Sequence, residues 1–290
     1  MGGRAKTPLA AYVAARLRDM GERPAILSRG YGRRDAVDGV VVVRDAGGIR
    51  ADLDRAGDEP LMLARQLDGV PVLVCASRHL AGRLAEHHFG CTVHVLDDGF
   101  QHFALQRDAD IVIVAREDVE QGRTLPAGRL REPLDALAAA DAIVTLGDAA
   151  MPDSRQPAWR ARRTLQAVRP AEPSGAPMTA ADGPVLALAG IAEPDGFFAD
   201  LRAAGWTVSR ELRFRDHHRY SRRDVSAIAA AAHHSGARAV VTTEKDLVRL
   251  LPFRPFPFPV GVAPLALRID APDTFDHWLM ERVHRARRES

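Results

Sequence analysis

The sequence has 290 residues and a mass of 31.5 kDa, which suits one large or two modest domains. A hydrophobic fraction of 46% and a charged fraction of 27% exclude a disordered or collagen-like chain. The 40 basic and 38 acidic residues give a net charge of +2, so electrostatics offer no reason to expect nucleic acid as the main partner.

Cysteine use and hydropathy bear on the compartment. Cys75 and Cys91 are the only cysteines, and no secretory leader is recognisable, so we expect a reducing compartment and no disulfide framework. No apolar run reaches the ~18–20 residues that a membrane-spanning helix needs.

The first predicted element is a helix over residues 8–20, because Leu9, Val13 and Leu17 recur at intervals of four. The residues around its start are typical of the second half of a phosphate-binding loop: Gly2, Gly3, Lys6 and Thr7. In such a loop, backbone N–H groups hold phosphate, the lysine reaches the β and γ oxygens, and the hydroxyl binds Mg²⁺. The pattern is incomplete, since Ala5 replaces its last glycine, and an ordinary glycine-rich N-terminus is the alternative.

Short apolar runs then alternate with helical patterns as far as residue 148. Strands are expected at residues 23–28, 70–74, 92–96, 110–114 and 142–146, a further apolar run lies at 40–43, and helices are expected at 58–67 and 80–87. This alternation predicts an α/β fold whose mostly parallel sheet is covered on both faces.

Polar residues follow several of these strands, at the sheet edge where such folds bind ligands. Arg29, Arg78 and the pair Asp97–Asp98 each come after a predicted strand. An acidic residue at the end of an apolar strand is the usual Mg²⁺ partner of a phosphate loop. The alternative is a surface turn, because Asp-Asp-Gly is also a good turn sequence.

The second half of the chain reads as a connector followed by a smaller α/β unit. Strands are expected at residues 185–189, 206–209 and 239–242, and helices at 195–204 and 222–234, while residues 252–259 contain four prolines and exclude a regular element. We therefore divide the chain into an α/β core at 1–148, a linker arm at 149–184, a smaller α/β domain at 185–270 and a C-terminal helix at 271–290.

Lysine is rare among the basic residues. Only Lys6 and Lys245 are lysines, and nearly all other basic positions are arginine. These two lysines could have been kept by chance. The alternative is that these two positions need a compact ammonium, which a planar guanidinium cannot replace.

Taken together, nine motifs occur in the order that a known family has. They are Gly2-Gly3-x-x-Lys6-Thr7-Pro8, Leu27-Ser28-Arg29-Gly30-Tyr31-Gly32, Gly57-Asp58-Glu59-Pro60, Arg78, Asp97-Asp98-Gly99-Phe100-Gln101-His102, Leu125-Pro126-Ala127-Gly128-x-Leu130-Arg131-Glu132, Gly190-Ile191, Asp216-His217-His218 and Thr242-Thr243-Glu244-Lys245-Asp246. On these motifs the chain resembles the tetraacyldisaccharide 4′-kinase family of lipid A biosynthesis.

The resemblance implies an activity and a cellular place. The fold would be a P-loop kinase core with a smaller lid, ATP with Mg²⁺ would be the phosphoryl donor, and the 4′-hydroxyl of a tetraacyldisaccharide 1-phosphate would be the acceptor. It further implies a monomer in the cytoplasm, peripheral on the inner membrane, that binds no nucleic acid.

The resemblance also implies roles for individual residues. Asp58 would be the general base, working with His217. The remaining roles are phosphate binding by Gly2, Gly3, Lys6 and Thr7, metal binding by Thr7, Asp97 and Asp98, and lining of the site by Glu59, Arg78, Gln101 and Arg29.

Two other functions stay open. One is a truncated or degenerate homologue that binds lipid or nucleotide without efficient catalysis. The other is an unrelated P-loop NTPase, although no Asn-Lys-x-Asp guanine motif follows the core. We also expect coding sequence upstream of Met1 that supplies the first strand and an amphipathic membrane segment.

Overall fold

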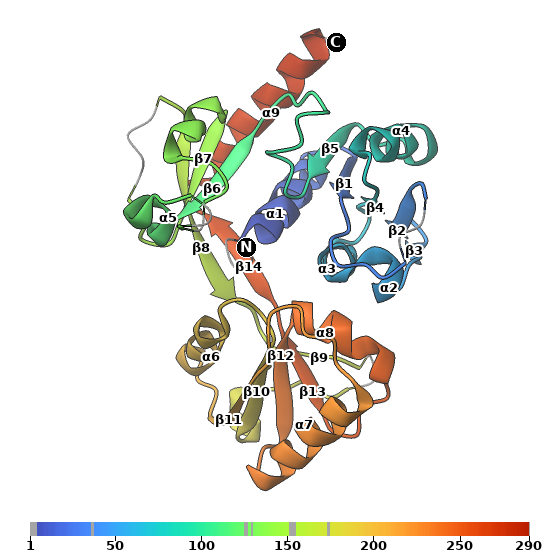
Figure 1. Cartoon of the computed structure of the whole chain (residues 1–290), viewed down its shortest axis with the longest axis vertical. Helices are drawn as coiled ribbons and strands as arrows, with labels where there is room; N and C mark the ends of the chain where they lie inside the picture. Colours follow the sequence, from blue (N-terminus) through green and yellow to red (C-terminus); the bar gives the residue numbers. More distant parts are fainter. Residues whose placement is uncertain are drawn as a thin grey trace. The chain divides into compact units, whose positions relative to one another are not determined.

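The structure is a computed structural model that describes residues 5–35, 38–124, 127–128, 130–150, 155–172 and 175–289. Its contacts divide the chain into two compact units (Figure 1). Unit 1 contains the described residues up to Arg163 and those from Leu267 onward, and unit 2 runs from Thr164 to Ala266. The chain passes between the units in β8 (Ala158–Leu165) and in β14 (Leu265–Ile269).

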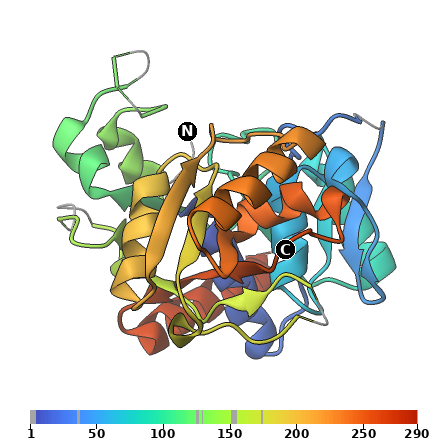
Figure 2. The ribbon, with the colours of Figure 1, turned by 90° about the horizontal axis from the view of Figure 1, so that it is seen from below.

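The first sheet of unit 1 has the strand order β3-β2-β4-β1-β5. Its strands are β1 (Pro24–Ser28), β2 (Val41–Asp45), β3 (Gly48–Ile49), β4 (Val72–Val74) and β5 (Val93–Leu96). β1 is parallel to both of its neighbours, and Ile26 lies opposite Val72 and Val95. β2 and β3 form an antiparallel hairpin at the outer edge (Figures 1 and 2), so the apolar run at 40–43 does not join the sheet as a parallel strand.

The second sheet of unit 1 has the order β14-β8-β7-β6. β6 (Ile111–Ala115), β7 (Ala142–Leu146) and β8 are parallel. The predicted α/β class and the mostly parallel strands are therefore confirmed, but the described residues of unit 1 form two sheets rather than one. In the described part of the chain, β5 and β6 are end strands of their sheets, and the side chains of β5 and of the first three residues of β6 are only half-buried.

The helices of unit 1 cover these sheets. They are α1 (Lys6–Asp19), α2 (Leu53–Ala56), α3 (Asp58–Gln66), α4 (Arg78–Phe89), α5 (Arg116–Gln121) and α9 (Pro272–Glu289), with a 3₁₀ turn, η1 (Leu134–Ala139). Leu9, Val13 and Leu17 of α1 are buried, as their spacing predicts. They share one core with Phe275 and Trp278 of α9, so the first and last helices close the same unit.

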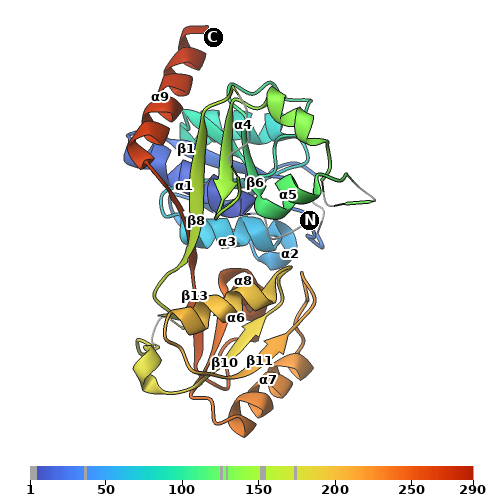
Figure 3. The ribbon, with the colours of Figure 1, turned by 90° about the vertical axis from the view of Figure 1, so that its left-hand side faces the viewer.

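Unit 2 is built on one sheet with the order β11-β10-β12-β13-β9. Its strands are β9 (Arg169–Pro170), β10 (Val185–Ala189), β11 (Val208–Arg213), β12 (Ala239–Thr243) and β13 (Val260–Ala263), its helices are α6 (Pro194–Ala203), α7 (Arg222–His234) and α8 (Glu244–Leu250), and its 3₁₀ turns are η2 (Ala180–Asp182) and η3 (Leu251–Phe253). Alternate side chains of β10 face opposite ways: Ala187 packs with α6, and Leu188 packs with α7. The two helices therefore lie on opposite faces of the sheet (Figure 3).

Several short elements of the second half lie outside the sequence-based prediction. The strands β13 and β14 and the helix α8 lie in stretches for which the pattern predicted no element. Within the proline-rich segment 252–259, residues 252 and 253 belong to the 3₁₀ turn η3, contrary to the prediction, and residues 254–259 form no helix or strand, as expected. Among the described residues, no helix combines the length and the apolar character that crossing a membrane requires.

Candidate active site

The first turn of α1 and the carboxyl end of β5 bring four predicted site residues together. Lys6 and Thr7 begin α1, and Asp97 and Asp98 directly follow β5. Lys6 Nζ lies 2.5 Å from Asp98 Oδ1, and Thr7 Oγ1 lies 3.2 Å from Asp97 Oδ2. Because α1 packs on β1 and β5, the backbone holds both pairs in place. These four of the residues assigned to phosphate and metal binding thus form one cluster.

Asp97 is buried, with 5% of its surface exposed. Burial and then the negative charge of Glu59 raise the pKa of Asp97 to about 7, although the hydrogen bond from Thr7 and the charge of Lys6 act in the opposite direction. A buried carboxylate of this kind is stabilised by a nearby cation. Asp97 and the Thr7 hydroxyl therefore fit Mg²⁺, which takes one or two protein oxygens together with phosphate oxygens.

We expect Asp97→Asn to make the protein more stable than the parent at pH 8, by about 4 kcal/mol. The pKa of Asp97 rises on folding from its ordinary 3.8 to about 7. The parent therefore has its full stability below about pH 4 and loses it as the pH rises through about 7, whereas the amide stays neutral. Urea unfolding without nucleotide or Mg²⁺ measures this, and the difference should shrink to about 1–2 kcal/mol at pH 5. A difference that does not change with pH would contradict the assignment.

Asp98 belongs to a charged network that extends beyond the predicted residues. Arg131 Nη2 lies 3.2 Å from Asp98 Oδ2, and Arg131 Nη1 lies 3.3 Å from Gln101 Oε1. Gln101 Nε2 in turn donates to Glu132 Oε1 at 3.1 Å. Burial alone would raise the pKa of Asp98, but Lys6 and then Arg131 lower it below its usual value. Arg131 and Glu132 were not among the predicted site residues, although an Arg-Glu pair that ends a motif was a usable signal.

Arg78 is a buried cation at the start of α4. It is 4% exposed, and its Nη1 donates to the Ala76 carbonyl oxygen at 2.9 Å. Burial and then the charge of Arg29 lower the pKa of Arg78, while Asp98 and Asp97 act in the opposite direction. Within the described residues its Nε has no hydrogen-bond partner. A buried guanidinium with a spare donor, next to a second cation, fits a phosphate group.

Asp58 begins α3 and is 7% exposed. Its Oδ1 accepts a hydrogen bond from the Glu59 backbone N–H at 3.1 Å. Gly57 precedes it with a φ of 85°, and a Cβ there would lie 3.0 Å from the Tyr31 carbonyl oxygen, so glycine allows the loop after β1 to approach the helix start. Glu59 lies close enough to Asp97 to raise its pKa, which places the Asp58–Glu59 pair beside the cluster.

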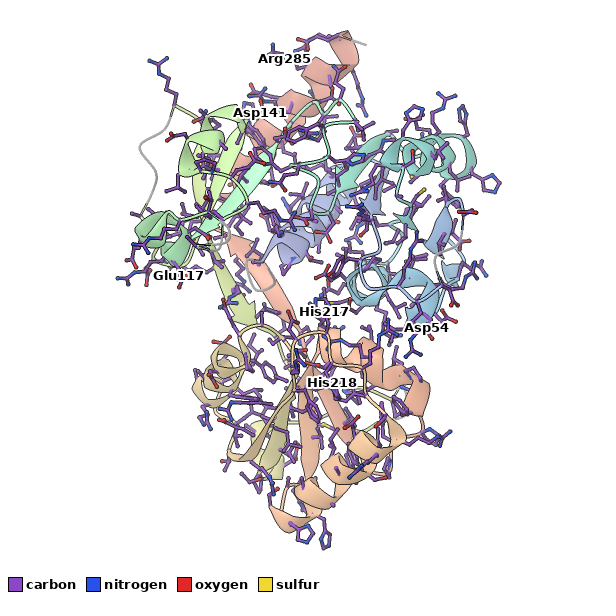
Figure 4. The ribbon with its side chains drawn as sticks, viewed as in Figure 1. Asp54, Glu117, Asp141, His217, His218 and Arg285 are labelled. Carbon is purple, nitrogen blue, oxygen red and sulfur yellow. The ribbon has the colours of Figure 1, made fainter. Side chains whose placement is uncertain are left out.

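The other predicted catalytic residue lies in unit 2. His217 and His218 are in the loop between β11 and α7, beside α8 (Figure 4). His217 has a left-handed φ of 58°, and its Nε2 lies 3.1 Å from Lys245 Nζ. Asp58 and His217 therefore belong to different units, and the structure describes each within its own unit.

The phosphate-binding loop is described only from Ala5 onward, because Gly2 and Gly3 lie outside the described residues. Ala5 has a φ of 54°, a left-handed conformation that glycine adopts without strain. This backbone geometry explains why the phosphate-loop pattern has glycine at the position before Lys6. In the described ranges, no group of three or more His, Cys, Asp or Glu side chains could hold a metal, so a cation here would depend on Asp97, Thr7 and phosphate oxygens.

Comparisons with known proteins show the family to which this chain is similar. The family described as tetraacyldisaccharide-1-P 4′-kinase matches residues 1–284. A tetraacyldisaccharide 4′-kinase from Bradyrhizobium diazoefficiens is 40% identical over 299 residues, which cover 99% of this chain and 83% of that protein. Another from Nitrobacter winogradskyi is 39% identical over 302 residues, with coverage of 99% and 84%.

A solved structure also matches. It is a crystal structure of LpxK from Aquifex aeolicus in complex with ATP, with a TM-score of 0.79 and 28% sequence identity. The match covers 98% of this chain and 85% of that chain.

Proposed function

This chain belongs to the tetraacyldisaccharide-1-P 4′-kinase family, and we propose that it transfers the γ-phosphoryl group of ATP to the 4′-hydroxyl of a tetraacyldisaccharide 1-phosphate. The observation that carries the proposal is the double pairing of Lys6 with Asp98 and of Thr7 with Asp97. An ammonium for phosphate oxygens and a hydroxyl–carboxylate pair for a metal ion are the parts that a P-loop kinase needs. The ATP complex of the Aquifex aeolicus protein supports the choice of nucleotide.

The chemistry follows from these side chains. The 4′-oxygen forms a bond to the γ-phosphorus as the bond to ADP breaks, and Asp58 takes the proton that the hydroxyl loses. Lys6 and the buried Arg78 stabilise the negative charge on the phosphate oxygens. His217 is assigned to support the base, on the strength of the Asp216-His217-His218 motif.

Mg²⁺ would be held by Thr7 and Asp97, with Asp98 nearby. When bound, it neutralises charge on the phosphate oxygens of the nucleotide. The raised pKa of Asp97 supports this assignment, because a buried acid with a pKa of about 7 has no full counter-charge in the protein itself.

The acceptor is a lipid, so we propose that the chain works at the cytoplasmic face of the inner membrane. We also propose that it works as a monomer. Two large aromatic side chains support contact with apolar material: Tyr31 is 76% exposed after β1, and Phe103 is 77% exposed after β5. Single exposed aromatics are common, but these two follow the strands that also lead into Arg29 and Asp97.

A transfer assay tests the proposed function against the degenerate homologue. The purified chain is incubated with [γ-³²P]ATP, Mg²⁺ and tetraacyldisaccharide 1-phosphate in mixed micelles. We expect a labelled bisphosphorylated lipid and one ADP for each lipid. Nucleotide binding without label in the lipid would contradict the proposal and favour a homologue that has lost catalysis.

A further inference from the structure

Lys245, one of the two lysines of the chain, contacts the imidazole of His217 within unit 2. Its Nζ lies 3.1 Å from His217 Nε2 and 3.4 Å from Asp216 Oδ1, and its side chain is only 14% exposed. An ammonium has three donors and no acceptor, so Nε2 must be the acceptor in this contact. A neutral imidazole that accepts at Nε2 carries its ring proton on Nδ1.

We propose that Lys245 is a positioning residue that holds His217 in the tautomer with its proton on Nδ1. The tautomer itself does not depend on the proposed function; only the effect of Lys245 on catalysis rests on it. A ring with its proton on Nδ1 can donate a hydrogen bond from Nδ1 to an ionised carboxylate, which can only accept one. An ammonium suits this place because it is a compact point charge that can donate to two partners at once.

The fold fixes the position of Lys245 through its neighbour Asp246. Asp246 is fully buried and accepts hydrogen bonds from the Gly190 backbone N–H at 3.0 Å, the Tyr220 hydroxyl at 2.8 Å and the Thr243 hydroxyl at 2.7 Å. Thr243 also caps α8 by accepting from the Asp246 N–H. The start of α8 is therefore tied to two separate parts of unit 2 as well as to its own cap, which leaves Lys245 little freedom to move.

The histidine loop is fixed from the same helix. Arg249 Nη1 donates to the carbonyl oxygens of Gly190 and His218, at 3.0 and 3.3 Å. Its side chain is 3% exposed. His217 takes its left-handed backbone conformation next to this anchored point. Such strain persists only where surrounding contacts enforce it, and these contacts come from α8.

A second partner makes the tautomer depend on Lys245. Asp216 Oδ2 lies 3.8 Å from His217 Nε2, so two charged groups face the same ring nitrogen. The ammonium requires a lone pair on Nε2, whereas the carboxylate favours a proton there. Without the ammonium, the Asp216 carboxylate still faces Nε2 and favours a proton there. The ring proton should then move from Nδ1 to Nε2.

The test is the ¹⁵N–¹H spectrum of the histidine rings in the full chain above pH 8, where a histidine ring is ordinarily neutral. A His217→Asn variant assigns the His217 signals. We expect the parent ring to carry its proton on Nδ1, and Lys245→Met to move the proton wholly or largely to Nε2. Asp216→Asn is the matched control: it keeps an oxygen for the His217 backbone N–H, which Asp216 Oδ1 accepts at 3.0 Å, and should keep the parent tautomer.

Kinetics supply the second readout. Lys245→Met should lower kcat by about 10-fold to 100-fold and leave the KM for ATP unchanged. The expected loss is smaller than that for an acid–base group itself, because Lys245 acts only through His217. A general loss of structure would instead lower the melting temperature and affect both constants. If the parent transfers no phosphate, the proposed function fails, but the ring spectrum still decides the tautomer.

Two results would overturn the proposal. One is a parent ring that carries its proton on Nε2, which needs no variant and so does not depend on whether Lys245→Met folds. The other is a folded Lys245→Met protein whose His217 keeps the proton on Nδ1 to the same extent as the parent.

Discussion

Asp58→Asn is expected to lower kcat by about 10²–10⁴ and to leave the KM for ATP nearly unchanged. The amide keeps the size of the side chain, and its oxygen can still accept the Glu59 N–H that Asp58 Oδ1 accepts at 3.1 Å. The start of α3 should therefore survive, while the group that takes the proton of the acceptor hydroxyl is lost. Steady-state phosphoryl transfer at saturating ATP and lipid measures the change.

Asp54→Asn provides the matched control for this variant. Asp54 lies in α2, and its side chain is 46% exposed (Figure 4). Its substitution is the same acid-to-amide change, only four residues before Asp58. It should keep parental turnover. If Asp58→Asn also turned over at the parental rate with both substrates saturating, Asp58 would not be the base.

Periodicity and strand punctuation were enough to predict most of the regular elements. The spacing of Leu9, Val13 and Leu17 placed α1 correctly, because those side chains form one buried face. β7 and β10 were placed to the residue, since each is a short, mostly apolar run that ends at a glycine. In such segments the local pattern and the tertiary packing demand the same structure.

The sequence was less informative where tertiary pairing decides the structure. Val41 and Val43 could belong to either kind of strand, and β2 is antiparallel to both β3 and β4, which the local pattern does not indicate. The separation of the strands of unit 1 into two sheets depends on which strands pair, and the local pattern carries no such information. β13 and β14 are short and follow a run of prolines, so no periodicity could develop.

The site was partly predictable for a different reason. The contacts Lys6–Asp98 and Thr7–Asp97 each join residues about 90 positions apart in the sequence. The sequence neighbours Lys6-Thr7 and Asp97-Asp98 nevertheless each form a recognisable chemical pattern at an element boundary. Arg131 reaches Asp98 from a segment without regular structure, so no periodicity indicated that contact, although Arg131 lies in one of the motifs. Lys245 was noticeable because lysine is so rare in this chain and because it lies in a motif.

Lys6→Arg is expected to lower kcat/KM for ATP by about 10²–10³, although the positive charge is kept. In the structure the ammonium lies 2.5 Å from Asp98 Oδ1, and Arg131 already holds the other carboxylate oxygen at 3.2 Å. A guanidinium is larger and planar, and we expect it to pair with Asp98 side-on instead of reaching the β and γ phosphate oxygens. Charge alone would therefore not restore function.

Lys6→Met and Arg131→Lys separate the contributions of charge and of shape. Lys6→Met removes the charge and should be at least as impaired as Lys6→Arg. Arg131→Lys keeps a cation near Asp98 but loses the guanidinium that joins Asp98 to Gln101, and we expect a milder loss because Arg131 only supports the acidic residue. Nucleotide titrations and steady-state rates at saturating lipid give both constants for each variant. Parental kinetics for Lys6→Arg would show that any cation suffices at the start of α1, and this segment would then not be a phosphate-binding loop.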